Sequence, residues 1–416
     1  MSVGKIRIDV PLLLTALALS VFGILTVYSA GQTEVRTLAV NAWRAQVVWF
    51  GIALVGAWLI SRASVRMIEW LTVPIYWFSI ILLVVTLIIG TGAGTAASTK
   101  SWLTIGGYRL GQPSELAKIT VVLMLARVLS NRKEAPRSLL ELWKPAFYVG
   151  LPWLLIMAQP DLGTGLVFIG ILFGMLFWFG APWPLLLLVA SPAISLVLAF
   201  SSTLWAIWFL LLLALVLWYK PFIHEGIAVV VANVAFGVLA PILWGNLKPY
   251  QQKRLTVFLD PSLDPREAGY HVTQSKIAIG SGGLTGKGFT LGTQKRLAFL
   301  PEQHTDFIFS VVGEELGFIG VTVALTLFFV LFLRVIRVAE RASDSFASLV
   351  AFGILSGWFV HVLVNVGMTL SLMPITGIPL PFFSYGGSFL LASWLAIGIQ
   401  LRIANEGRGR TTGLAI

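Results

Sequence analysis

The run VPLLLTALALSVFGILTV, from Val10 to Val27, carries no charge and decides the fold class. An apolar run of this length can cross the hydrocarbon core of a bilayer as an α-helix. It is longer than the apolar core of a signal peptide, so we expect it to be retained as the first helix. Across the whole chain 57% of residues are hydrophobic and 11% charged, whereas soluble domains are about 25% charged. The sequence therefore predicts an integral membrane protein.

Further apolar runs follow along the chain and predict an all-α polytopic membrane protein. About twelve helices are expected, near residues 10–28, 43–61, 70–90, 114–131, 143–158, 163–181, 183–200, 203–218, 226–245, 306–333, 346–370 and 385–403. We treat residues 1–416 as one membrane domain. The region 183–245 is the hardest to divide, because only Ser201, Ser202 and Thr203 separate two of its runs.

The lysines and arginines of the short loops predict the orientation of the chain. One set of loops holds most of them, and the opposite set holds only Arg36, Arg44, Lys100 and Arg109. Both termini are therefore expected in the cytoplasm. The net charge of +11 is explained by these loops, so we expect no nucleic-acid partner.

A polar segment, residues 246–306, interrupts the apolar runs after about the ninth span and should therefore lie outside the cell. It contains Asp260, Asp264, Glu267, Glu302 and Asp306. Loops of this length are usually functional or disordered. Apolar and aromatic residues recur in it, which favours order. We expect the chemistry in this extracytoplasmic loop, on an already activated substrate because no ATP is available there.

The loop also contains the glycine cluster GSGGLTGKG, from Gly280 to Gly288. It does not match a nucleotide-binding P-loop, which would require glycine at Ser281 and a hydroxyl residue at Gly288. One interpretation is a backbone that approaches an anion closely, with Lys287 beside it. The alternative is a flexible, turn-rich linker.

Ionisable residues at membrane depth are costly and are functional candidates by default. Glu115 and Lys118 open the fourth span three residues apart, so they share a helix face and can pair. They either line a pocket that faces the outer leaflet or neutralise each other at an interfacial helix start.

Three other positions near the spans carry polar groups. Asp161 lies between two spans, and we favour a helix cap for it. Glu314 and Glu315 are adjacent and cannot both face one partner, so at least one is expected to face a wet cavity. His361 and Asn365 share a face of the eleventh span, where a hydrogen-bonded structural role is favoured.

Several reaction classes lack support in the sequence. Cysteine is absent and only four histidines occur, which excludes thiol chemistry and argues against a multi-histidine metal site. No HExxH or GxSxG motif is present. No cofactor is assigned, although carboxylates of the loop could bind Mg²⁺ or Mn²⁺.

Longer motifs connect the chain to a known family. The loop and the tenth span contain DPSLDPREAGYHVTQSKIAIGSGGLTGKG (260–288) and FLPEQHTDFIFSVVGEELGFIG (299–320). Elsewhere the chain contains GQPSELAK (111–118), AQPDLGT (158–164) and NVGMTLSLMPITGIPLPFFSYGGS (365–388). In this order they resemble the SEDS family of bacterial cell-wall polymerases, and within it the rod-shape enzymes rather than the division enzymes.

The resemblance implies a peptidoglycan glycosyltransferase that polymerises lipid II, an undecaprenyl-pyrophosphoryl disaccharide-peptide. The family's catalytic acidic residue in DPxGxGY corresponds here to Asp264. A sugar hydroxyl needs a general base, which we assign to Asp264. Attack opposite the leaving group would invert the anomeric carbon without a covalent intermediate. Taken alone, Asp264-Pro265 would be read as turn chemistry.

The departing pyrophosphate requires cations, for which Lys118 and Lys276 lead over Arg109, Arg254 and Lys287. Glu115, Gln274 and Ser384 lie in family-matching segments and complete the expected substrate contacts. For Lys295 and Arg296 we favour a solvated loop face. The lipid tail requires an apolar groove, expected near the fourth span.

The sequence departs from the family pattern in two places. Relatives often have Arg before the tryptophan that is Trp102 here, where this chain has Ser101. Relatives are also expected to have ten spans, so the region 183–245 is expected to contain an inserted helix pair.

Two alternatives to the polymerase stay open. A lipid II flippase would need polar residues along a whole pore, and a scaffold of the elongation complex would not need Asp264. The resemblance also implies a class B penicillin-binding protein as partner and the bacterial cell membrane as location.

Overall fold

The structure is a computed structural model that describes residues 9–34, 37, 39–92, 101–105, 108–247, 252, 256–258, 260, 268–300 and 302–413. Its elements are α1 (Val10–Ala30), α2 (Ala42–Arg62), α3 (Val65–Ile89), β1 (Leu103–Ile105), β2 (Tyr108–Gly111), α4 (Pro113–Ser130), the 3₁₀ turn η1 (Leu140–Leu142), α5 (Trp143–Ala158), α6 (Leu162–Trp178), α7 (Trp183–Leu198), α8 (Ser202–Tyr219), α9 (Ile223–Asn246), α11 (Ala268–Gly282), α12 (Thr293–Arg296), α13 (Ile308–Glu340), α14 (Ser345–Thr369) and α15 (Gly387–Gly413).

Each of the predicted spans falls on one of these helices, α1 to α9 and α13 to α15, which confirms the predicted fold class. Among the described residues, 8 helices are long and apolar enough to cross a membrane. The other four, α4 to α7, are shorter or, in α4, carry three charged side chains.

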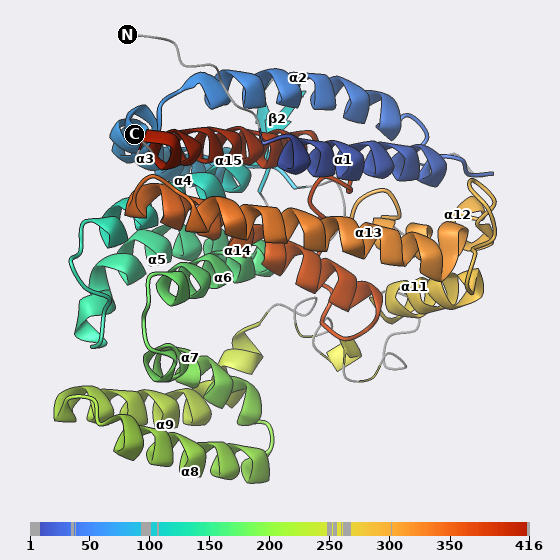
Figure 1. Cartoon of the computed structure of the whole chain (residues 1–416). Coiled ribbons are helices and arrows are strands. Elements are labelled where there is room, and N and C mark those ends of the chain that lie inside the picture. Colours follow the sequence, from blue (N-terminus) through green and yellow to red (C-terminus); the bar gives the residue numbers. More distant parts are fainter. Residues whose placement is uncertain are drawn as a thin grey trace.

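Most of the helices run side by side in one bundle, with α14 at its centre (Figure 1). This helix packs against α4, α6, α13 and α15. In its most apolar stretch 72% of the residues are buried, against 6% in α8. Because a helix that is apolar all round must be covered by protein or by lipid, α14 forms the core and α8 faces the bilayer.

Helices α7, α8 and α9 form a group beside the bundle (Figure 1). Asn233 joins α9 to α7: its amide donates to Ser191 (2.8 Å) and accepts from Ser195 (2.6 Å). Trp208 of α8 also donates to Ser195, at 3.1 Å. The buried Glu225 attaches the group to the bundle by accepting hydrogen bonds from the Ser138 hydroxyl and the backbone of Leu140. Apolar packing adds to this connection, because Leu185 of α7 belongs to the buried core of the bundle.

Several described elements were not predicted, namely η1, the loop helices α11 and α12, and a short hairpin. Strands β1 and β2 pair antiparallel, with Thr104 opposite Arg109. The strands are only three and four residues long, too short for a strand periodicity to stand out between apolar spans. The dipeptide Gly106-Gly107 in the sequence was the available signal, because it is common in two-residue hairpin turns.

Helix α13 is broken at Gly317, whose backbone (φ 61°, ψ −157°) is not helical. In an unbroken helix the amides of Phe318 and Ile319 would donate to the carbonyls of Glu314 and Glu315. The segment Gly280–Gly288 supplies partners for all four groups, and we call this contact the glycine junction. Its backbone hydrogen bonds run from Phe318 to Gly283 (2.9 Å), from Ile319 to Leu284 (3.1 Å), from Lys287 to Glu314 (3.0 Å) and from Gly288 to Glu315 (3.0 Å).

The glycine junction explains the glycine cluster and corrects one expectation. The amides of Lys287 and Gly288 donate to α13, so the interpretation as an anion cradle is wrong for them. Glycine is needed for close approach: a Cβ at Gly286 would lie 2.0 Å from the Glu315 carbonyl oxygen, at a φ of +80°. The glycine cluster therefore packs closely against α13 and supplies hydrogen-bond partners for the backbone groups at the break.

We predict that Gly286→Ala destabilises the protein by at least about 2 kcal/mol, because it adds a backbone clash to an unfavourable φ. The measurement is the thermal unfolding midpoint of the purified protein in detergent. Gly280→Ala is the matched control, because nothing lies within 4 Å of a Cβ at that position of α11. Equal midpoints for the two variants would contradict the role of the junction.

Candidate functional site

The first buried charge pair of the site lies at the start of α4. Pro113 begins the helix at a position where a missing amide hydrogen costs nothing. Glu115 follows in the first turn, where the helix dipole favours a carboxylate. The ammonium of Lys118 lies 2.8 Å from one Glu115 oxygen and 3.0 Å from the other. The predicted pairing is confirmed, and both residues are buried.

His361 on α14 completes the site. Its Nε2 lies 2.9 Å from Lys118 Nζ, and its Nδ1 lies 2.9 Å from the carbonyl oxygen of Pro379. A carbonyl can only accept, so Nδ1 carries the proton and Nε2 accepts from the ammonium. The imidazole is therefore neutral and hydrogen-bonded, as favoured from the sequence, but it also holds Lys118. The contact with Lys118 was missed, because 243 positions separate the two residues.

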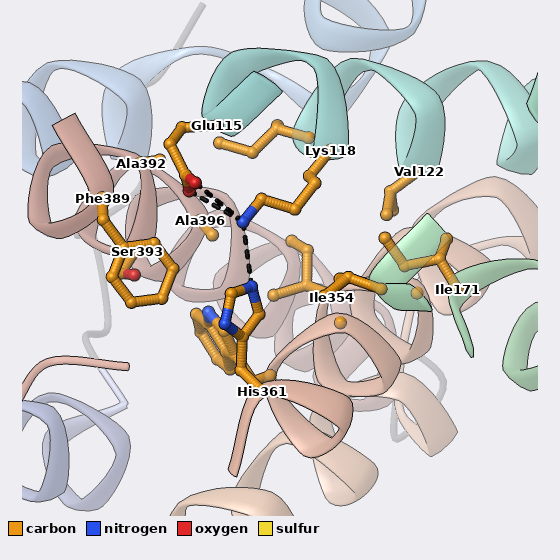
Figure 2. A pocket seen from close by; sticks show the side chains of 15 residues that line it. Glu115, Lys118, Val122, Ile171, Ile354, His361, Phe389, Ala392, Ser393 and Ala396 are labelled. Atoms are coloured by element: carbon orange, nitrogen blue, oxygen red, sulfur yellow. Dashed lines mark hydrogen bonds and ion pairs between the residues drawn. The ribbon is translucent and has the colours of Figure 1, made fainter. Parts of the chain in front are cut away.

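Figure 2 shows the three side chains converging at one end of a pocket. The pocket is lined by residues of α4, α6, α14 and α15, among them Val122, Ile171, Ile354 and Ala396. Phe389 packs its ring over the ammonium of Lys118, 5.0 Å from Nζ. Ser393 also lines the pocket, and its buried hydroxyl makes no hydrogen bond with the described residues. The arrangement is an apolar pocket with an ion pair at one end.

A polar contact fixes the chain next to this pair. Asp161 accepts from the backbone amide of Thr164 at 3.0 Å and so caps α6, as predicted. Its other carboxylate oxygen accepts from the Gln112 side chain at 3.1 Å. The cap therefore ties the start of α6 to the start of α4.

A second cluster of buried charges lies beside the glycine junction. The Lys295 ammonium is 2.7 Å from Glu315 and also donates to the Ser29 hydroxyl at 2.8 Å. Lys287 is 2.9 Å from Glu314. Burial lowers the pKa of Lys295, while Glu315 acts in the opposite direction. Each carboxylate has its own lysine.

The cluster corrects two expectations. Glu314 and Glu315 are both buried, so neither faces a wet cavity. Lys295 has no exposed surface, so the solvated loop face was wrong for it. Arg296 does keep an exposed side chain and pairs with Glu34 at 2.7 Å. Both errors have one cause, because the partners come from α1, α12 and α13 and no local spacing reveals them.

The other candidate residues are spread over the structure. Ser384 is buried, and its hydroxyl donates to the Thr305 carbonyl at 2.6 Å. Gln274 is partly buried and Lys276 exposed on α11. Arg109 belongs to β2. Asp264, Glu267 and Arg254 lie outside the described residues.

The described part of the chain holds no cluster of metal-ligating side chains. No group of three His, Asp or Glu side chains there could hold a metal ion. His304, a histidine of the polar loop, packs against the ring of Tyr385 in a tilted arrangement. Burial lowers the pKa of His304, and the neighbouring Glu302 raises it.

The fold and the site together define a multi-pass membrane protein with an ion pair buried at the end of an apolar pocket. A family model described as cell cycle protein, of the FtsW, RodA and SpoVE type, matches residues 10–211 and 202–409. The chain belongs to this family, which confirms the resemblance found in the sequence. The two matched segments meet within α8.

Curated relatives align over almost the whole chain. The peptidoglycan glycosyltransferase MrdB of Escherichia coli (strain K12) is 37% identical over 96% of this chain and 94% of its own length. The peptidoglycan glycosyltransferase RodA of Treponema pallidum is 35% identical over 96% of this chain and 98% of its own.

Solved structures share the fold. A chain from a peptidoglycan synthase complex, described as coordinating polymerization and crosslinking, superposes with a TM-score of 0.71 at 28% identity and covers 96% of this chain and 98% of that one. The rod shape determining protein RodA of Thermus thermophilus gives a TM-score of 0.62 at 26% identity, covering 96% and 97%.

We predict that Lys295→Met destabilises the protein by about 3–5 kcal/mol, because it leaves the Glu315 carboxylate buried without its cation. Arg296→Gln is the control: it removes the same charge from the adjacent position, where the exposed pair with Glu34 contributes about 0–1 kcal/mol. Unfolding midpoints in detergent report both. A Lys295→Met variant as stable as Arg296→Gln would refute the assignment.

Proposed function

We propose that this chain is a peptidoglycan glycosyltransferase that polymerises lipid II into glycan strands during cell elongation. The observation that carries the activity is the similarity along the full chain: relatives named peptidoglycan glycosyltransferases align over 96% of it. The intact Glu115–Lys118 pair at the end of an apolar pocket supports a lipid-linked substrate.

The chemistry follows from the substrate. Lipid II carries its sugar on a pyrophosphate, so the bond to be broken already has a good leaving group. The acceptor hydroxyl must lose its proton as it attacks, and a positioned base contributes about 10²- to 10⁴-fold. We assign this base to Asp264. Pro265 favours an extended backbone at Asp264, which would project the carboxylate away from the chain. One-step displacement inverts the anomeric carbon, so a single essential carboxylate is sufficient.

Charge develops on the pyrophosphate as it leaves, and a cation inside an apolar pocket stabilises it more strongly than one in water. Lys118 is our first candidate for this role. In the unliganded protein Glu115 neutralises its ammonium and His361 accepts from it. An arriving phosphate would share the ammonium with Glu115, so the lysine is held ready without an unpaired buried charge.

The other cationic side chains are assigned different roles. Lys276 is exposed on α11, and together with Arg109 and Arg254 it is proposed to contact the pyrophosphate from the loop side. Lys287 is engaged by Glu314 and Thr293, so we assign it to the glycine junction. Gln274 and the buried hydroxyl of Ser393 are proposed as polar contacts, whereas Ser384 keeps the loop after α14 in place.

We further propose that both termini are cytoplasmic, that the polar loop is extracytoplasmic, and that a class B penicillin-binding protein supplies crosslinking. The topology is supported by the bias of lysine and arginine among the short loops. The partner is supported by the likeness to a chain from a synthase complex that couples polymerization and crosslinking.

We predict that Asp264→Asn lowers glycan polymerisation from lipid II by about 10²- to 10⁴-fold, because the acceptor hydroxyl loses its base. The assay uses the purified protein with its penicillin-binding partner. Asp260→Asn in the same loop is the matched control, with the same loss of charge at an exposed position. If Asp264→Asn polymerises lipid II as fast as Asp260→Asn and the wild type, Asp264 is structural and Glu267 becomes the next candidate.

We also predict that the double variant Glu115→Gln/Lys118→Met folds but loses about 10²- to 10³-fold in polymerisation. Replacing both members of a buried ion pair is often neutral for stability, whereas Lys118→Met alone leaves a buried carboxylate unpaired and is strongly destabilising. Comparing unfolding midpoints with polymerisation rates separates the two effects. A stable double variant that polymerises at the wild-type rate would reduce the pair to a structural role.

A further inference from the structure

A second pocket, distinct from the first, opens between the end of α4 and the start of α5. It has a volume of about 370 Å³ and is lined by Met124, Arg127, Val128, Asn131, Trp143, Lys144, Phe147 and Tyr148. These two helices lie side by side (Figure 1). The size is within the range of small-ligand sites.

The charge of this lining is one-sided. Arg127 and Lys144 are its charged members, and no acidic residue belongs to it. The nearest carboxylate in sequence, Glu141, is held by Arg132 at 3.1 Å. Two cations that meet no carboxylate across a pocket create a positive potential there, which attracts an anion.

Arg127 is fixed in position by a single hydrogen bond among the described residues. It is partly buried, and its Nη1 donates to the backbone carbonyl of Glu69 on α3 at 2.9 Å. A guanidinium has five N–H donors in a planar fork that fits a phosphate. No carboxylate within the described residues pairs with Arg127 in this structure. A phosphate oxygen is therefore a suitable partner for its remaining donors.

The rest of the lining has the character of a membrane interface. Lys144 is exposed, and its ammonium lies 5.4 Å from the ring centroid of Trp143. Trp143, Phe147 and Tyr148 are aromatic residues of the first turns of α5. Trp and Tyr concentrate where the acyl region of a bilayer meets the headgroups. The pocket thus combines cations for a phosphate with apolar side chains for the first carbons of an acyl chain.

We propose that this pocket binds the phosphate headgroup of an anionic phospholipid of the surrounding bilayer. Basic pockets between membrane helices are suited to such headgroups. Arg127 binds the phosphate, Lys144 adds a second charge, and Met124, Val128 and Phe147 contact the acyl chains. This site is independent of the glycosyl transfer proposed above, which uses the other pocket.

The test measures lipid binding to the full-length protein by native mass spectrometry, with phosphatidylglycerol and phosphatidylcholine of identical acyl chains. We expect phosphatidylglycerol to bind preferentially. Arg127→Gln and Lys144→Gln should each weaken its binding about fivefold, which corresponds to ~1 kcal/mol per basic residue near an anionic surface. Lys133→Gln is the control, because this exposed lysine lies near the same helix end but does not line the pocket.

The possible outcomes decide the proposal. Equal binding of the two lipids, or equal losses in Lys133→Gln and in the pocket variants, would overturn it. Millimolar inorganic phosphate provides a further arm: if it displaces the lipid as well as a second phospholipid does, the pocket binds free anions and the lipid assignment is wrong. Should Arg127→Gln fail to fold through loss of its contact with α3, the exposed Lys144 still provides the test.

Discussion

The structure depends on the rule that buried backbone polar groups must be hydrogen-bonded within the protein. The break of α13 at Gly317 leaves two carbonyls and two amides without their helical partners, and each of these four groups makes a hydrogen bond in the glycine junction. A broken membrane helix is tolerated where another part of the protein supplies the missing partners. The position of the polar loop thereby becomes fixed to the bundle. Helix α11 ends in this junction, and α12 reaches α13 separately, because the amides of Gln294 and Lys295 donate to the Glu314 carboxylate.

The glycine junction also sets the positions of charged side chains. Glu314 and Glu315 come directly before the break, and their carboxylates meet Lys287 and Lys295 from the polar loop. Since an unpaired buried charge costs several kcal/mol, these pairs disfavour any other register of the loop. The backbone hydrogen bonds and the charge pairs therefore favour the same position of the loop against α13. The part of the polar loop that follows α11 is held against α13 in this way.

At the first pocket, too, a buried charge is paired within the protein, but here the pair borders a cavity. Lys118 meets both Glu115 and His361, and the neutral imidazole accepts from the ammonium without adding charge. The charges of Glu115 and Lys118 cancel, but the pair keeps a dipole at the edge of an apolar pocket. That arrangement places a buried ammonium at one end of the pocket without leaving its charge unpaired.

The sequence by itself determined what depends on local spacing. Apolar runs located the membrane helices, Asp161 was identified as a cap, and three residues of separation predicted the Glu115–Lys118 pair. The family motifs identified the class of enzyme. Tertiary structure alone decided the partners of Lys295, Glu315 and His361 and the use of the glycine cluster. The physical reason is that a buried charge or a freed carbonyl takes whichever partner the packing brings near. Ser29 meets Glu315 across 286 positions of the chain, a separation over which no periodicity carries information.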